Sequence, residues 1–328
     1  DGGCGASCRA ARAGSRVRSC AGACRRERGG EDRAVNVGVR GGNRGVGTVH
    51  RFDEALDLLD GAEALGAEPT GLERQRIVLR TALGEPMGPL VARAEALVAL
   101  SDRYDHWTVL AATLSAAGRY EEADAAYVRA LGRYRDVSPF ALAWVSFVRG
   151  VMWSESAGRA DLGERLYRDA LARLPSYVVA NVHLSELESP DAAVARLTPL
   201  AQTAHSSDPE PAFRVAERMA DSPAREVYVT DALQRYEVLL ARDRGAFLDH
   251  AAEFFGSAGA DLPRAQTMAL ENLSLRPTPR AYQLAIQTSR DAGDLEGACR
   301  LRHDARDAAL RHAVLQQLLT TMELECAR

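Results

Sequence analysis

The stretch that decides the fold is WTVLAATLSAAGRYEEADAAYVRA, residues 107–130. Its apolar residues recur at the spacing of one helix face on both sides of Gly118: Trp107, Leu110, Ala111 and Leu114, then Ala123, Tyr127 and Ala130. Two helices approach each other closely only where small side chains meet. We therefore predict a helical hairpin in which Ala111 and Ala123 lie at the contact and the larger residues fill the space on either side.

This order of residues resembles the tetratricopeptide repeat, which has Trp, Leu, a small and a large residue, then Ala, an aromatic residue and Ala. The resemblance is fair over 144–175, 262–277 and 280–305 and weaker over 70–100 and 177–245. We expect helices at 223–242, 247–255 and 262–275 among others, and the first helix of the pair that begins near Pro139 looks a turn longer than standard. It implies an all-α solenoid of about eight helical hairpins within residues 48–328, covered by a final helix near 309–326. Residues 248–255 and 272–282 also resemble a group of bacterial tetratricopeptide proteins without an assigned activity.

The chain divides into a Gly/Arg-rich segment, 1–46, which we expect to be disordered, and a repeat domain, 47–328. Cys4, Cys8, Cys20 and Cys24 form two equally spaced pairs in the first segment. They would suit a zinc ion or two disulfides, although low-complexity composition also accounts for them. Residues 50–65 read as the second helix of a repeat, but Gly-rich residues 37–47 cannot supply the first. The segment is either a flexible tail or not the native partner of the rest.

Composition argues against nucleic acid as the partner. All 41 basic residues are Arg, which is typical of a GC-rich genome and fits a bacterial source. The first 46 residues hold ten Arg against four acids, and the rest holds 31 Arg against 41 acids, so the predicted repeat domain is acidic. No apolar run reaches the length of a membrane span. Because the chain begins at Asp1, its compartment stays open: cytoplasm or, with an upstream signal sequence, the bacterial cell envelope.

The sequence holds no phosphate-binding loop, no nucleophile elbow and no His-Glu-x-x-His. His250 and Glu253 lie three apart beside Asp249, a spacing that a metal could use, but a charged helix face is the simpler interpretation. We interpret His183 as packed or groove-lining. Cys299 and Cys326 could approach each other if the last helix folds back, but we interpret them as free thiols. We therefore predict no catalytic residue, no metal site and no cofactor.

The resemblance implies that the first helices of the hairpins line a concave groove. The groove positions that we assign to partner binding are Asp105, Thr108, Arg149, Arg280, Gln283, Gln287 and Arg290. Ala112 stands where members of the family that bind a terminal carboxylate need Asn, so that mode of binding is not expected. Arg149, Arg280 and Arg290 would instead suit an acidic peptide.

The leading hypothesis is a non-enzymatic scaffold that binds a protein or peptide of unknown identity along this groove. One alternative is a regulatory or sensor module of a larger signalling or cell-envelope protein. Another is a metal-dependent hydrolase that uses the region of His250 and Glu253.

Overall fold

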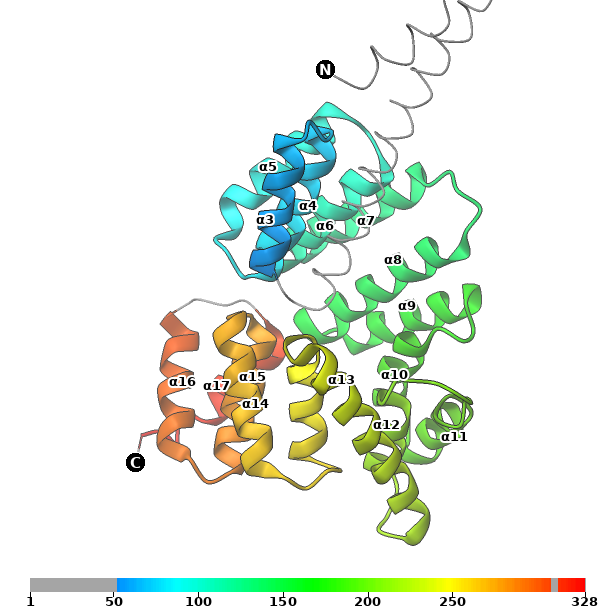
Figure 1. Cartoon of the computed structure of the whole chain (residues 1–328), viewed down its shortest axis with the longest axis vertical. Coiled ribbons are helices and arrows are strands. Elements are labelled where there is room, and N and C mark those ends of the chain that lie inside the picture. Colours follow the sequence, from blue (N-terminus) through cyan, green and yellow to red (C-terminus); the bar gives the residue numbers. More distant parts are fainter. Residues whose placement is uncertain (1–51, 308–311, 328) are drawn as a thin grey trace, which may run out of the picture. The chain divides into compact units, whose positions relative to one another are not determined.

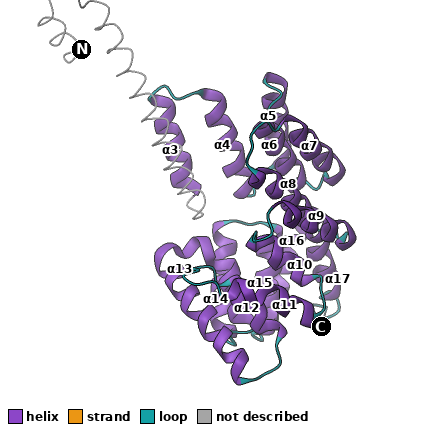
Figure 2. Cartoon of the chain, turned by 90° about the vertical axis from the view of Figure 1, so that its right-hand side faces the viewer, coloured by secondary structure: helices purple, strands orange, loops and turns teal. Residues whose placement is uncertain are grey.

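The computed structural model describes residues 52–307 and 312–327. These residues form fifteen α-helices, one short π-helix and no strand (Figures 1 and 2). The predicted all-α fold of sequential helical pairs is confirmed. Residues 1–46, with their four cysteines, lie outside the described residues. The contacts divide the chain into two units, Asp1–Leu72 and Glu73–Arg328.

The described part of the first unit holds α3, Phe52–Ala64, and the start of α4, Pro69–Ala82. Along α3 the residues Phe52, Ala55, Leu59 and Ala62 are buried. Their spacing of three and four residues is that of one helix face. This face is the one that the sequence pattern predicts for the second helix of a repeat.

The second unit continues from α4 through helices that pack mainly on their neighbours in sequence. The pairs α6 with α7, α8 with α9, α10 with α11 and α15 with α16 lie side by side in Figure 1. The helices are α5 Met87–Leu100, α6 Tyr104–Ala116, α7 Tyr120–Arg133, α8 Pro139–Val151, the π-helix η1 Met152–Ser156, α9 Ala160–Arg173, α10 Val178–Glu186, α11 Pro190–Ala201, α12 Glu210–Arg218, α13 Pro223–Gly256, α14 Leu262–Leu275, α15 Pro279–Asp291, α16 Leu295–Asp307 and α17 Ala313–Thr321.

Several helices of the second unit start with a capping side chain followed by proline. The Ser138 hydroxyl accepts a hydrogen bond from the Phe140 amide, and the Thr278 hydroxyl accepts one from the Ala281 amide. Proline follows directly in both cases, at a position whose amide has no partner within the helix. These Ser-Pro and Thr-Pro steps explain why α8 and α15 begin where they do.

The hairpin predicted at 107–130 is α6 and α7. Gly118 has φ of 72° in the turn between them, a conformation that costs other residues free energy. Ala111 and Ala123 are fully shielded from solvent. They belong to a core cluster with Leu110, Leu114 and Tyr127, as the repeat pattern predicts.

The helices expected at 223–242 and 247–255 are the two halves of α13, which are separated by a kink at Asp243, where φ is −147° and ψ is 71°. Two features differ from the sequence-based expectation. The final helix, α17, is shorter than the helix expected near 309–326. Cys299 and Cys326 are joined by a disulfide, so the prediction of free thiols is wrong. The short final helix ends before Cys326, and the chain after it brings Cys326 back to α16.

The first helix of the pair at 139–175 was expected to exceed the usual length, and this is confirmed. α8 ends at Val151, and η1 carries the helical path on to Ser156. A π-helix adds a residue to each turn, so it changes the direction in which the side chains after it point. This change of direction concerns Glu155 of η1, which lines a cavity of the second unit.

Candidate functional site: a charged cavity between first helices

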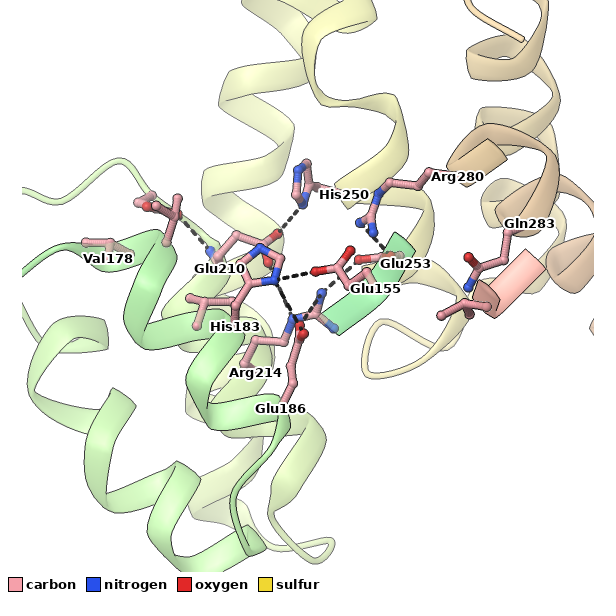
Figure 3. A pocket seen from close by; sticks show the side chains of 14 residues that line it. Glu155, Val178, His183, Glu186, Glu210, Arg214, His250, Glu253, Arg280 and Gln283 are labelled. Carbon is pink, nitrogen blue, oxygen red and sulfur yellow. Dashed lines mark hydrogen bonds and ion pairs between the residues drawn. The ribbon is translucent and has the colours of Figure 1, made fainter. Parts of the chain in front are cut away.

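The second unit contains a cavity of about 240 Å³ lined by η1, α10, α12, α13, α15 and α17, together with Asp208 before α12 (Figure 3). Apart from α17, the lining helices are first members of successive pairs, counting the second half of α13 as the partner of α14. One part of the lining is apolar and is formed by valines: Val178, Val179, Val182 and Val314. The charged part consists of Glu155, His183, Glu186, Asp208, Glu210, Arg214, His250, Glu253 and Arg280.

Each of four first helices presents two polar side chains to the cavity at a spacing of three or four residues. On an α-helix this spacing places both side chains on the same face. The pairs are His183 and Glu186 on α10, Glu210 and Arg214 on α12, His250 and Glu253 on α13, and Arg280 and Gln283 on α15. Four helices from different repeats therefore contribute to one network.

Glu253 joins two arginines at the centre of this network. Its Oε1 lies 2.7 Å from Nη2 of Arg280, and its Oε2 lies 2.8 Å from Nη2 of Arg214. Arg214 also lies within ion-pair distance of Glu186, Glu210 and Glu217. Burial lowers the pKa of Arg214. The four carboxylates around it, which are Glu253 and the three just named, outweigh burial and raise the pKa. Both arginines are therefore already neutralised by groups of the chain itself.

A second group surrounds His250. Its Nδ1 lies 3.3 Å from Oε1 of Glu210, which also accepts a hydrogen bond from the hydroxyl of Tyr236. Burial alone would lower the pKa of His250, but Asp249 and Glu210 raise it to about 9. Burial alone would raise the pKa of Glu210, but His250 and Arg214 lower it to about 2. His250 and Glu210 thus form a charged pair at neutral pH.

The third group is Glu155, His183 and Glu186. His183 Nδ1 lies 2.8 Å from Oε1 of Glu155 and 3.6 Å from Oε2 of Glu186 (Figure 3). Burial opposes charge on both members of the closer pair, yet their attraction raises the pKa of His183 and lowers that of Glu155. Burial raises the pKa of Glu186 and of Asp208. For these last two carboxyl groups, the positive charge nearby does not outweigh the effect of burial.

Of the seven residues assigned to partner binding from sequence, Arg280 and Gln283 line the cavity. Asp105 is paired with Arg74 and Arg103, and Thr108 is buried. The other three lie outside the cavity lining: Arg149, which is 2.8 Å from Asp124; Gln287, which is exposed; and Arg290, which is 3.0 Å from Asp291. The seven residues do not form one cluster.

His250 and Glu253, which one hypothesis from sequence joins in a metal site, have separate partners across the cavity. Among the residues that the structure describes, the set that brings His and carboxylate groups within 4.8 Å of one another is Glu155, His183 and Glu186. His183 was expected to be packed or groove-lining, and it does line the cavity. Sequence reasoning missed Glu155, Glu186, Glu210 and Arg214, although the repeated polar pairs on successive first helices were a usable signal.

No protein-family profile matches the sequence, and no curated protein does. Among solved structures, the chain is similar to the APC/C hetero-tetramer Cut9–Hcn1, with 11% identity, a TM-score of 0.47 and coverage of 87% of this chain and 55% of that one. It is also similar to yeast Tom70, with 15% identity, a TM-score of 0.43 and coverage of 84% and 58%.

A tetratricopeptide repeat protein from Parabacteroides merdae is similar as well, with 11% identity, a TM-score of 0.35 and coverage of 88% and 98%. The chain thus spans little more than half the length of the first two proteins. These similarities to tetratricopeptide repeat proteins concern the arrangement of helices and carry no information about ligands. No helix in the described ranges is long and apolar enough to cross a bilayer.

Proposed function

We propose that the protein is a non-enzymatic scaffold that binds a segment of a partner protein along the first helices of its second unit. The observation that supports this most is the convergence of first helices from successive pairs on one cavity with a valine side and a charged side. A cavity with both kinds of lining suits a peptide that carries aliphatic and charged side chains.

The charge of the lining favours a basic segment over an acidic one. Five carboxylate residues line the cavity against two arginines and two histidines. Arg214 and Arg280 are already paired with Glu253, whereas Glu186 and Asp208 lack full compensation. A lysine or arginine side chain of the partner would supply the missing positive charge beside the valines.

The experiment is a selection of peptides from a random displayed library on the full chain, followed by fluorescence polarisation with the selected peptides. We expect enrichment of Lys or Arg next to aliphatic residues. Val179→Arg changes a residue that lines the cavity. It should weaken binding about tenfold, because the arginine fills part of the cavity and carries the same positive charge as the basic peptide. Val128→Arg is the matched control, since Val128 is an exposed valine on α7, a second helix outside the cavity.

Two results would contradict the proposal. Equal loss in both valine variants would show that binding does not use the cavity. Selection of acidic peptides, with tighter binding by Val179→Arg, would show that the partner has the opposite charge.

A further inference from the structure

The group of Glu155, His183 and Glu186 has the composition of a metal site. It offers one imidazole nitrogen and two carboxylate oxygens, the ligands that zinc and other first-row divalent cations accept. All three residues are partly buried and line the cavity. They come from two elements, η1 and α10, which both flank α9 in the fold.

The two closest atoms of this group are shielded from solvent. Glu155 Oε1 and His183 Nδ1 each have almost no accessible surface, and neither makes a hydrogen bond of acceptable geometry. They nevertheless lie 2.8 Å apart. Buried polar atoms lose their contacts with water, so each of these two atoms depends on the charge of the other. A cation bound to both would satisfy them.

The distances match those between two ligands of one ion. Metal bonds of about 2.1 Å place neighbouring ligand atoms ~3.0 Å apart at right angles and ~3.4 Å apart in a tetrahedron. The contacts of His183 Nδ1 are 2.8 Å with Glu155 and 3.6 Å with Glu186. The separations within the group reach no more than 4.8 Å, so the three atoms lie close enough together to be candidate ligands of one ion.

The surrounding residues hold the ligands in place. The ring of His183 packs edge-on against Phe147, at a centroid distance of 5.2 Å, and lies 5.8 Å from Tyr167. The second oxygen of Glu186 lies 3.6 Å from Nη2 of Arg214, so this carboxylate is oriented from behind. Such outer contacts fix ligand geometry in known metal sites. The π-helix η1 directs Glu155 toward α10, and π-helical turns often occur at functional sites.

We propose that Glu155, His183 and Glu186 bind a divalent cation of the zinc type, with a remaining coordination position open to the cavity. Binding of the ion at Nδ1 of His183 releases the proton of the imidazolium to solvent, and the two carboxylates then balance the charge of the ion beside a neutral imidazole. A donor from a bound partner or water completes the coordination. This site lies in the same cavity as the proposed peptide site and shares Glu186 with it, but zinc binding itself needs no partner peptide.

The test uses the full chain in which Cys4, Cys8, Cys20 and Cys24 are changed to Ser, so that these thiols do not bind the metal. Zinc binding is measured by equilibrium dialysis against a competing chelator, and cobalt binding by its visible absorption. We expect one zinc ion per chain. His183→Ala and Glu186→Gln should each weaken zinc binding by at least about tenfold, since loss of even an outer-shell contact has effects of that size.

His205→Asn is the matched control. His205 is an exposed histidine outside the cavity lining, and Asn tolerates its φ of 61°. Its zinc affinity should equal that of the parent chain. Circular dichroism checks that each variant folds. If His183→Ala does not fold, the zinc affinities of Glu155→Gln and Glu186→Gln test the proposal in its place. Absence of stoichiometric zinc, or unchanged affinity in both glutamine variants, overturns the proposal and leaves His183 and Glu155 as an ion pair.

Discussion

At the scale of single residues, the second unit contains charges that depend on one another. Asp249 is buried, and its carboxylate lies 2.9 Å from Arg276 and 3.9 Å from Arg280. Next to it, His250 faces Glu210, with Asp208 and Arg280 also acting on this group from other segments. Removing one partner of such a network leaves a buried charge without compensation. Each member is therefore more costly to lose than an exposed ion pair.

This network makes stability depend on pH. Because the pKa of His250 rises from 6.5 to about 9 on folding, its contribution is complete below pH 6.5 and disappears as the pH rises through 9. His183 acts in the same direction. We expect the free energy of unfolding, measured by urea denaturation, to fall between pH 6 and pH 9.5. The fall should be smaller in His250→Gln but not absent.

The exposed-histidine variant His205→Asn is the control and should show the same fall as the parent chain. An equally large fall in His250→Gln would contradict the pKa assigned to His250. On the acid side, Glu210 contributes stability above pH 4.5 that is lost as the pH drops through about 2.

At the scale of elements, the pair formed by α8 with η1 and α9 depends on two glycines. A Cβ at Gly163 would lie 2.5 Å from Cβ of Ser154, and one at Gly150 would lie 2.5 Å from the ring of Tyr167. Most other pairs tolerate alanine at the corresponding small position, for example Ala123. The closer approach here accompanies the π-helix, which comes directly after α8.

We predict that Gly163→Ala lowers the free energy of unfolding by about 1–3 kcal/mol, because the added methyl group overpacks the contact with η1. Gly132→Ala is the matched control: Gly132 lies in α7 with nothing near its Cβ position. It should raise stability by up to about 1 kcal/mol, since alanine favours the helix. Urea denaturation of the two variants measures both effects, and the same sign in both would contradict the packing argument.

Sequence periodicity predicts most of these elements because each hairpin buries its own apolar face. The predicted helix 262–275 coincides with α14, and Gly118 ends the first helix of its pair as expected. The same reasoning places a helix boundary close to the kink at Asp243, and Gly245 lies two residues beyond it. The π-helix was visible only as extra length.

The candidate site was predicted less well, for a physical reason. Glu155, Glu210 and Arg214 look like ordinary charged residues on solvated helix faces. They become a site because the stacking of successive pairs brings η1, α10, α12 and α13 around one cavity. The spacing of residues along α10 indicates that His183 and Glu186 share one helix face. It does not indicate that η1 lies close enough to α10 for Glu155 to join them.

At the scale of the whole second unit, the C-terminal helix α17 contacts elements that come much earlier in the sequence. α17 packs against α15 and against η1, and Val314 of α17 lines the cavity. The Cys299–Cys326 disulfide fastens the chain after α17 to α16, across 27 residues. Arg302 of α16 adds a hydrogen bond to the Leu319 carbonyl. The disulfide therefore stabilises one wall of the cavity.

We predict that Cys326→Ser lowers stability by about 3–4 kcal/mol in the chain-entropy estimate for a loop of this length. Hydrogen exchange should become faster in residues 313–321 and in the cavity-facing part of η1, while α6 and α7 stay protected. Reduction of the parent chain should have the same effect. Unchanged exchange in α17 would show that packing alone holds it.

The kink at Asp243 affects where the chain can accept an inserted residue. Elsewhere, turns between helices can gain a residue with little effect on the next helix. Here Asp243 alone separates the two halves of α13, so an inserted residue would change the direction in which the second half runs. His250 and Glu253 would then leave the cavity together. We therefore expect this junction to accept substitutions more readily than insertions, and the loops between other helices to accept insertions more readily.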